Sequence, residues 1–444
     1  MERFDVIVIG AGVAGQTAAS ELAGAGKSVA VTDVREYGGT CALRGCEPKK
    51  VLFTAAEVVE RSQSQAGNGL EGVLDIDWSS LLAFKRTFTD DVPTNIEAWL
   101  SGSGVTLLHG AASFTAPDVV EIGGVSYTAD RFIIATGAVP RSLHIPGEEY
   151  VLDSEDFMAA EGLGEHIVFI GGGYVSFEFA HIAVAAGAQV TILHRGPRVL
   201  EAFDPELAGM LVSGYRAAGV DVLTDTAVTE IRAEDGTFTV VCDQGREVSA
   251  EMVVHGAGRV PAISGLGLDA AGIAYGGRGI EVDGRMRTVG NERVYAVGDT
   301  AAAGAPLTPV AIAQARAVVS DMLEPGFDGF VTPVTPSVVF SDPIMASVGM
   351  TVDQATAQGI EVDVKFTDSS GWASSRRIGQ RVSGARILVE RGSDRIVGAH
   401  LLGHAAGDVI NVFALAIASG QTASALKRLI WAYPTGASEI PYML

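Results

Sequence analysis

Cysteine is scarce in this sequence, with three residues among 444. So low a content excludes the dense disulfide framework on which small extracellular domains depend. Two of the three, Cys41 and Cys46, nevertheless lie five positions apart, which indicates chemistry. A cytoplasmic protein is the expectation that follows.

Long hydrophobic runs are missing as well. No uninterrupted apolar run reaches the roughly 18–20 residues that are needed to span a bilayer. The N-terminal run 6–9 is short, follows Asp5, and has no cationic region before it. It therefore predicts a buried strand and not a signal peptide.

Positive charge is in short supply. The chain has 31 Lys and Arg against 53 Asp and Glu, a formal net charge of -22 at pH 7. Such a chain repels nucleic-acid phosphates and anionic membrane surfaces, so neither is expected as a partner. A small-molecule substrate is the expectation.

What the sequence has is length, apolar residues and glycine. A chain of 444 residues is too long for a single core and fits two to four compact units. Hydrophobic residues make up 48% of it, which allows a large core, and its 55 glycines imply many tight turns and close backbone approaches.

A dinucleotide-binding pattern occurs near the N-terminus. The run FDVIVIGAGVAGQTAASELAGAGKSVAVTDV predicts a strand, a glycine turn, a helix and a strand, with Gly10, Gly12 and Gly15 forming GxGxxG. These glycines let the N-terminus of the helix approach a pyrophosphate, which its free N–H groups and dipole attract. Asp33 closes the second strand, where a carboxylate can bind ribose hydroxyls. A dinucleotide site is predicted here over a plain glycine turn.

The same device recurs in HIVFIGGGYVSFEFAHIAVAAGAQVTILHR. Gly171 and Gly173 hold the first two glycine positions, and Ser176 takes the third. A small side chain at the third position still permits close packing of helix on strand. A second dinucleotide site is therefore predicted.

Basic residues, and no carboxylate, follow the second strand of this repeat. Arg195 and Arg198 suit a 2′-phosphate, which a carboxylate would repel, so NADPH is predicted over NADH. A solvated basic turn is the alternative, and the nearby Glu201 weakens the case for NADPH.

Two dinucleotide sites in one chain indicate a bound FAD and a mobile nicotinamide cofactor. The first site lies beside the two cysteines in the sequence and is expected to hold the FAD. A later strand ends in Gly298-Asp299 before a helical stretch. Asp299 is either a helix N-cap or, beside the flavin, an acceptor for ribityl hydroxyls.

The segment EYGGTCALRGCEPKKVLFTAAEVVERS places the two cysteines at the start of a long helical stretch. Free N–H groups at the helix end, together with Arg44, Lys49 and Lys50, are expected to lower the thiol pKa values. This matters because a thiol with an ordinary pKa near 8.5 is only a few per cent thiolate at neutral pH. A redox disulfide between Cys41 and Cys46 is predicted.

Two structural thiols or a metal-binding pair are the alternatives to this redox disulfide. A metal would need two more soft ligands, and Cys242 lies far away in the alternating stretch TFTVVCDQG, where it is expected in the core. No metal site is predicted.

The run GGTCALRGCEPKK resembles the redox-active segment of the class I pyridine nucleotide-disulfide oxidoreductases, a family that includes glutathione reductase, dihydrolipoamide dehydrogenase and mercuric reductase. The resemblance covers essentially the whole chain. Further segments match in order, and they are Gly10-Ala11-Gly12, 134–137, 171–178, 258–261, Gly298-Asp299, 307–311 and a terminal domain beginning near Thr332. The cofactor contacts that these matches and the two patterns together indicate are Gly10, Gly12, Gly15, Asp33, Gly39, Thr40, Thr136, Gly137, Gly171, Gly173, Tyr174, Arg195, Arg198, Gly258, Asp299, Thr308, Pro309 and Ala311.

The resemblance also implies distinct roles for the two thiols. Cys46 would lie against the flavin as the charge-transfer thiolate, and Cys41 would be the interchange thiol that attacks a substrate disulfide.

Three further side chains acquire implied roles. Lys49 or Lys50 would lie near flavin N5 and pair with Glu178, since reduced flavin develops negative charge. Tyr174 would cover the nicotinamide pocket and move aside for NADPH.

The C-terminal segment departs from the family pattern. Disulfide reductases of this family carry a His-Pro-Thr segment and a Glu five positions after the His, which enter the partner's active site. Here Tyr433 stands at the His position and Ser438 at the Glu position, with Glu439 displaced by one. A positioned acid–base group contributes about 10²–10⁴ in rate. A phenol titrates near pH 10, so Tyr433 can donate a proton but is a poor base; packing at a dimer seam is its structural alternative.

The expected architecture is α/β, with two Rossmann-like dinucleotide-binding domains plus a C-terminal α+β dimerisation domain. The predicted ranges are 1–145 and 259–327 for the FAD-binding domain, 146–258 for the NADPH-binding domain and 328–444 for the interface domain. An obligate homodimer is expected, with each C-terminal segment completing the partner's site.

Three functions stay open. The first is an NADPH-dependent reductase of a small disulfide that uses Tyr433 in place of His. The second is an FAD-dependent reductase of a non-disulfide acceptor such as a quinone or a metal ion. The third is a redox sensor.

Overall fold

The computed structural model describes residues 1–444, and the chain divides into two compact units. Unit 1 comprises Met1–Lys49, Ala83–Arg141 and Arg259–Pro333, and unit 2 comprises Lys50–Leu82, Ser142–Gly258 and Val334–Leu444. Two helices, α3 (Cys46–Gln65) and α4 (Trp78–Thr89), contain a boundary between these ranges. No helix has both the length and the apolar character needed to cross a bilayer. The subdivision of the chain into four ranges stays a prediction.

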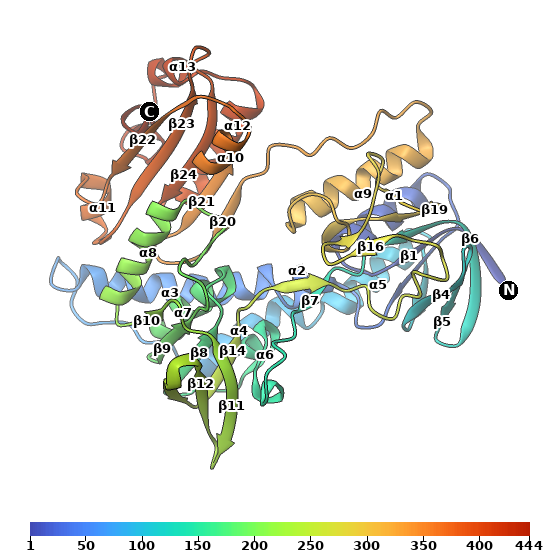
Figure 1. The fold of residues 1–444 in the computed structure, drawn as a ribbon, viewed down its shortest axis with the longest axis horizontal. Helices are drawn as coiled ribbons and strands as arrows, with labels where there is room; N and C mark the ends of the chain where they lie inside the picture. Colours follow the sequence, from blue (N-terminus) through green and yellow to red (C-terminus); the bar gives the residue numbers. More distant parts are fainter. The chain divides into compact units, whose positions relative to one another are not determined.

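Unit 1 is built on a mixed sheet with helices packed against it (Figure 1). Its strands are β1 (Glu2–Ile9), β2 (Val29–Asp33), β3 (Thr106–His109), β4 (Ala112–Ala116), β5 (Val119–Ile122), β6 (Val125–Ile134), β7 (Ala138–Pro140), β15 (Arg259–Pro261), β16 (Tyr275–Gly276), β17 (Gly279–Ile280), β18 (Arg287–Thr288) and β19 (Asn291–Ala296). Its helices are α1 (Val13–Gly24), α2 (Gly39–Leu43), α5 (Val92–Gly102) and α9 (Thr308–Leu323), with the short 3-10 helix η3 (Gly298–Thr300).

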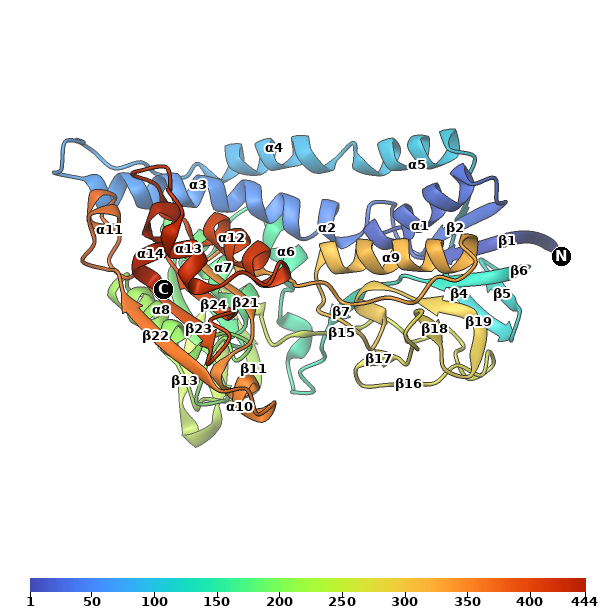
Figure 2. The same ribbon diagram turned by 90° about the horizontal axis from the view of Figure 1, so that it is seen from above.

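The central strands of unit 1 run in the order β18-β19-β6-β1-β2-β3. β19, β6, β1, β2 and β3 pair in parallel, so their carboxyl ends meet at one edge of the sheet, where ligands of such folds bind. The apolar run of β1 is fully buried at Ile7 and Val8, as a strand covered on both faces requires. Figure 2 shows α1 and α9 side by side in this unit.

Unit 2 contains one parallel sheet and two antiparallel sheets. Its first part holds α6 (Ser154–Ala159), β8 (His166–Ile170), α7 (Tyr174–Ala185), β9 (Gln189–Leu193), α8 (Pro205–Ala217), β10 (Asp221–Leu223), β11 (Val228–Glu234), β12 (Thr237–Cys242), β13 (Glu247–Ala250) and β14 (Met252–His255). Its second part holds β20 (Ser337–Val339), β21 (Met345–Gly349), α10 (Val352–Ala357), β22 (Val362–Asp368), α11 (Ala373–Arg377), β23 (Gly384–Glu390), β24 (Ile396–Leu402), α12 (Ala406–Ala418), α13 (Ala423–Arg428) and α14 (Ile440–Met443).

The parallel sheet of unit 2 has the order β10-β9-β8-β14, and one antiparallel sheet has the order β20-β21-β24-β23-β22. Strands β11, β12 and β13 form a separate antiparallel sheet. Helix α12 packs on β21 and β24 through buried Ile410 and Phe413. The two strand–glycine–helix–strand repeats and the C-terminal α+β part confirm the predicted fold class.

Candidate active site

Cys41 lies within α2 and Cys46 is the first residue of α3, and both are free thiols. The hydroxyl of Thr308, the first residue of α9, donates to Cys41 Sγ at 3.3 Å. The same hydroxyl oxygen lies 3.9 Å from Cys46 Sγ. One side chain from a distant part of the sequence therefore contacts both sulfur atoms.

The surroundings move the two thiol pKa values in opposite directions. The hydrogen bond from the Cys41 side chain is the main cause that lowers the pKa of Cys46 to about 6, and the Thr308 hydroxyl and the charge of Lys49 act in the same direction. The same sulfur–sulfur hydrogen bond and burial raise the pKa of Cys41. At neutral pH the reduced pair therefore holds a thiolate at Cys46 and a proton at Cys41.

The prediction that the basic residues lower both thiol pKa values is confirmed for Cys46 and wrong for Cys41. Lys49 acts on Cys46 as expected. Arg44 instead forms an ion pair with Glu36, and its side chain is only 10% exposed. Two thiols that share a hydrogen bond cannot both lose their protons easily, since the second thiolate would face the first.

The first glycine loop is shaped for a ligand. A Cβ on Gly10 would lie 2.3 Å from the Ala135 carbonyl oxygen, and one on Gly15 would lie 1.9 Å from the Gly10 carbonyl oxygen. The fold itself therefore demands these two glycines. A Cβ on Gly12 would meet nothing closer than Gly39 Cα at 3.8 Å. The space above Gly12, at the N-terminus of α1, fits the pyrophosphate of FAD.

Two carboxylates border this loop. Asp33 accepts hydrogen bonds from the backbone N–H groups of Ala11 at 2.7 Å and Arg35 at 2.9 Å. Asp299 lies in η3, caps no helix, and makes no hydrogen bond to another residue. Burial raises the pKa of Asp299, while Arg259 opposes the shift. A half-buried carboxylate without a partner fits the hydroxyl-rich chain of FAD better than the N-cap alternative.

The remaining candidates for FAD contact lie at the same edge of unit 1. Gly39 has φ +69°, and a Cβ there would lie 2.4 Å from Gly12 Cα. Thr136 donates to the Ala262 carbonyl oxygen at 2.7 Å, directly after β6. The other members of this group are Gly137 after β6, exposed Thr40 in α2, and Pro309 and Ala311 in the first turn of α9.

The second glycine loop repeats the backbone pattern of the first. Gly171 N–H donates to the last carbonyl of β9 at 2.8 Å, as Gly10 N–H does to Thr32 at 2.7 Å. Gly173 caps α7. Ser176, in the third glycine position, is fully buried and donates to the Gly171 carbonyl oxygen at 2.5 Å.

His194 takes the place that Asp33 has in the first repeat. Its Nδ1 accepts the hydrogen bond of the Gly172 N–H at 3.1 Å, as the Asp33 carboxylate does for Ala11. The sequence shows His194 at the end of the strand, but its role depends on a backbone contact that the sequence does not display.

Arg195 and Arg198 follow His194 and are exposed. No hydrogen bond or ion pair engages either guanidinium group, so both charges are available to a ligand. Glu201, with a side chain 66% exposed, lies 3.8 Å from His194 Nε2.

A lysine and a glutamate of unit 2 meet at Phe340. Lys50 Nζ lies 3.7 Å from the centroid of the Phe340 ring and 4.0 Å from that of Phe53. Glu178, only 3% exposed, accepts the Phe340 N–H at 2.8 Å. Within unit 2, Lys50 and Glu178 thus both contact Phe340. Within unit 1, Lys49 lowers the pKa of Cys46. Tyr174 opens α7 and is half exposed.

The positive φ of +101° at Gly258 permits the chain to turn after β14, at the last residue of this part of unit 2.

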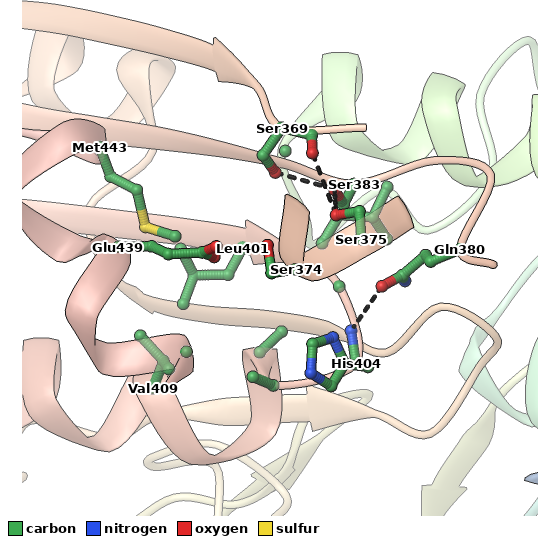
Figure 3. Close-up of a pocket in the computed structure, with 16 residues that line it drawn as sticks. Ser369, Ser374, Ser375, Gln380, Ser383, Leu401, His404, Val409, Glu439 and Met443 are labelled. Carbon is green, nitrogen blue, oxygen red and sulfur yellow. Dashed lines mark hydrogen bonds between the residues drawn. The ribbon is translucent and has the colours of Figure 1, made fainter. Parts of the chain in front are cut away.

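Tyr433 lies on an exposed apolar segment, whereas Glu439 lies in a different environment. Tyr433 is 86% exposed, and Ile430, earlier in the same segment, is fully exposed. Glu439 instead lines a cavity of about 30 Å³ in the C-terminal part of unit 2, together with His404 and several serines (Figure 3). Glu439 therefore faces its own domain and not Tyr433.

Comparison with known proteins gives consistent matches over the whole chain. Residues 4–315 match the family described as pyridine nucleotide-disulphide oxidoreductase, and residues 335–444 match the dimerisation domain of that family. The chain is 32% identical over 442 residues to the glutathione reductase of Burkholderia cepacia, covering 98% of this chain and 97% of that protein. It is also 32% identical over 443 residues to the dihydrolipoyl dehydrogenase of Thermus scotoductus, covering 98% and 95%.

A solved structure has the same fold. The HOCl-induced flavoprotein disulfide reductase RclA from Escherichia coli, in its Cu(II) complex, superposes with a TM-score of 0.89 at 25% identity, covering 100% of this chain and 99% of that one.

Proposed function

The chain belongs to the pyridine nucleotide-disulphide oxidoreductase family, and from this premise we propose that it uses NADPH to reduce a low-molecular-weight disulfide through the Cys41–Cys46 pair. As a member of this family it is an enzyme, a flavin-dependent disulfide oxidoreductase that uses FAD and a pyridine nucleotide. When bound, FAD accepts hydride from the nicotinamide and delivers two electrons to the disulfide.

The observation that carries the proposal is the asymmetry of the reduced thiol pair. Because Cys46 is the thiolate and accepts the hydrogen bond of Cys41, it can take the Cys41 proton as Cys41 attacks. Cys41 then forms a mixed disulfide with one half of the substrate, and the other half leaves as a thiolate. Cys46 then loses the proton that it took, to solvent, and as a thiolate attacks Cys41 Sγ and releases the second half as a thiolate. With one proton from solvent, the thiol–thiolate pair and one disulfide thus give one protein disulfide and two thiols.

The separate roles of the two thiols determine what Tyr433 must supply in place of the family's His. A base is already present in Cys46, so the remaining need is an acid for the departing thiolate. Tyr433 has a proton to donate and is exposed. We assign the acid role to Tyr433.

The preference for NADPH is supported by the second glycine loop. The imidazole of His194 accepts the backbone hydrogen bond that a carboxylate accepts in the first loop, so no acid stands there to repel a 2′-phosphate. Arg195 and Arg198 offer unpaired positive charge next to it. Replacing Arg195 by Ala should raise KM for NADPH about tenfold and leave KM for NADH nearly unchanged. The exposed Arg278, changed to Ala, is the matched control, and equal effects on both cofactors would refute the assignment.

A homodimer follows from the dimerisation domain and from the exposed apolar C-terminal segment. Residues 429–433 include Leu429 at 55% and Ile430 at 101% exposure, which is costly to leave in water. We propose that the partner subunit covers this segment and receives Tyr433 in its active site.

The function is tested by NADPH consumption with purified holoenzyme. Small disulfides should be reduced by the wild type and by Cys242→Ser, which changes a buried thiol outside the pair. Cys41→Ser should abolish this turnover. Tyr433→Phe should lower kcat about 10²-fold, at the lower end of the range for a positioned acid. Disulfide turnover that survives Cys41→Ser would refute the proposal.

A metal cation is the second candidate acceptor, and one observation favours it. The structure of RclA was solved as a Cu(II) complex, and a reduction of Cu(II) needs no acid at position 433. In that case NADPH consumption would depend on Cu(II), and Tyr433→Phe would leave its rate unchanged.

A further inference from the structure

Negative charge acts on Cys41 from two neighbours. The Cys46 thiolate and the Glu47 carboxylate both disfavour a second negative charge on this thiol. Under the proposed function Cys41 is the sulfur that an incoming disulfide must approach. An acceptor therefore meets a negative field at the point of attack.

The cations of the same segment are engaged elsewhere. Arg44 is largely buried and paired with Glu36. Lys49 acts on Cys46, whose own charge it offsets. Lys50 Nζ lies over the rings of Phe53 and Phe340 at 4.0 and 3.7 Å.

Glu47, in contrast, has no partner. It is exposed in the first turn of α3, directly after Cys46, and no hydrogen bond or ion pair engages it. A carboxylate in the first turn also interacts favourably with the positive end of the helix dipole. The charge of Glu47 nevertheless still acts on molecules that approach from the solvent. The formal net charge of -22 adds a long-range field of the same sign.

Resting on the proposed function, we infer that Glu47 sets the substrate class, selecting cationic and neutral disulfides and disfavouring disulfides that carry carboxylates. Glu47 is a specificity determinant and takes no part in the exchange of the sulfur–sulfur bonds. Its effect should be electrostatic and should decline with ionic strength.

The test uses three disulfides of similar size and different charge. These are bis(2-aminoethyl) disulfide, a dication; bis(2-hydroxyethyl) disulfide, which is neutral; and 3,3′-dithiodipropionate, a dianion. Values of kcat/KM are measured with NADPH for holoenzyme of the wild type, Glu47→Gln and Glu47→Lys. The exposed Glu292, changed to Gln, is the matched control.

The readout is the ratio of kcat/KM for the dication to kcat/KM for the dianion. This ratio is compared between variants, because the intrinsic reactivities of the two disulfides cancel in that comparison. Glu47→Gln should lower this ratio about three- to tenfold at low salt, and Glu47→Lys should lower it further. The neutral disulfide should change by less than about twofold, and high salt should remove the difference between variants.

The outcomes distinguish a failure of the role of Glu47 from a failure of the proposed function. A ratio that stays the same in both Glu47 variants, while all three disulfides are reduced, overturns the inference and leaves the proposed function standing. If NADPH reduces the bound flavin but the wild type turns over none of the three disulfides, the proposed function fails, and the inference with it.

Discussion

At the scale of single residues, the hydrogen bond between Cys41 and Cys46 determines which sulfur keeps the proton. It lowers the pKa of Cys46 to about 6 and raises that of Cys41. Thr308 adds a hydroxyl that contacts both sulfur atoms. Under the proposed function, Cys46 would be the base next to the nucleophile Cys41, the role for which the family pattern has a His at the position of Tyr433.

The Thr308→Val variant tests this arrangement, because valine keeps the shape of the side chain and removes the hydroxyl. Since that hydroxyl lowers the pKa of Cys46, we expect the midpoint for alkylation of Cys46 to rise by about half to one pH unit above its wild-type value near 6. Rates of iodoacetamide labelling of the reduced protein, resolved by mass spectrometry, provide the measurement. Buried Cys242 reports any unfolding, and an unchanged midpoint would contradict the role of Thr308.

Asp342 is a second titrating residue, and it links stability to pH. Burial, together with Glu60 and Glu57, raises its pKa to about 7, while Arg61 opposes the shift. The folded state therefore binds more protons than the unfolded state between pH 4 and 7, so this carboxyl makes the protein less stable as pH rises through that range. The full penalty applies above pH 7.

Asp342→Asn removes this penalty and keeps a donor for Glu60. We expect the unfolding temperature to rise by about 2–4 °C at pH 8, about 1 kcal/mol for a unit of this size, and by less at pH 5. Scanning calorimetry at both pH values measures the difference, with exposed Asp221→Asn as the control. A gain that is larger at pH 5 than at pH 8 would have the wrong sign.

Some of these residues could be found from the sequence and others could not. The spacing of Cys41 and Cys46 and the position of Asp299 after an apolar strand are local patterns, and local patterns are what a sequence displays. The role of Thr308 between the two thiols depends on a contact across 267 positions. The raised pKa of Asp342 likewise depends on a distant helix, and such through-space effects have no local signal.

At the scale of elements, the sequence predicts the backbone pattern of the two glycine loops but not which of the glycines the fold requires. The sequence predicts strand, turn, helix and strand in both repeats, and both are present. It does not show that Gly10 and Gly15 are demanded by the fold while Gly12 is not, because that depends on how α1 approaches β1 and the chain after β6.

Two alanine variants distinguish a glycine that folding requires from a glycine that FAD binding requires. Gly15→Ala places a Cβ 1.9 Å from the Gly10 carbonyl oxygen, so it should prevent stable folding of unit 1, although Ala normally favours a helix by about 0.5–1 kcal/mol over Gly. Gly12→Ala has room within the chain and should fold with a normal circular dichroism spectrum. It should lose most of its FAD, because the Cβ occupies the space above the helix N-terminus.

Flavin absorbance per chain, together with the unfolding temperature of each variant, provides the measurement. Gly26→Ala is unsuitable as a control because its φ is +83°. Gly24, which ends α1 with open space around it, is the matched site for Ala. A Gly12→Ala protein that keeps a full complement of FAD would show that the space above Gly12 is not the cofactor site.

At the scale of the whole molecule, the proposed role of Tyr433 would connect catalysis with dimer assembly. A phenol at 86% exposure cannot act as a positioned acid until something fixes it. The apolar neighbours Leu429 and Ile430 make a partner subunit the natural cover, and residues 335–444 match the family's dimerisation domain. The proposed active site is then composed of Cys41 and Cys46 from one protomer and Tyr433 from the other.

Mixing two impaired variants tests this composition directly. Cys41→Ser homodimers have no interchange thiol, and Tyr433→Phe homodimers have no acid. In a mixed dimer with two-fold symmetry, one site combines both defects and the other combines wild-type Cys41 with wild-type Tyr433. Random exchange of subunits at equal concentrations makes half of the dimers mixed, so disulfide reduction should recover to about a quarter of the wild-type rate.

Recovery should follow the time course of subunit exchange, which light scattering and labelled subunits report independently. If Tyr433 instead acts in its own chain, each mixed dimer contains only impaired sites and the mixture stays at the average of the two parents. If Tyr433 only packs at the interface, the Tyr433→Phe parent is already active and mixing adds nothing. A rise above the average of the parents is expected only where Tyr433 crosses to the partner's thiol pair.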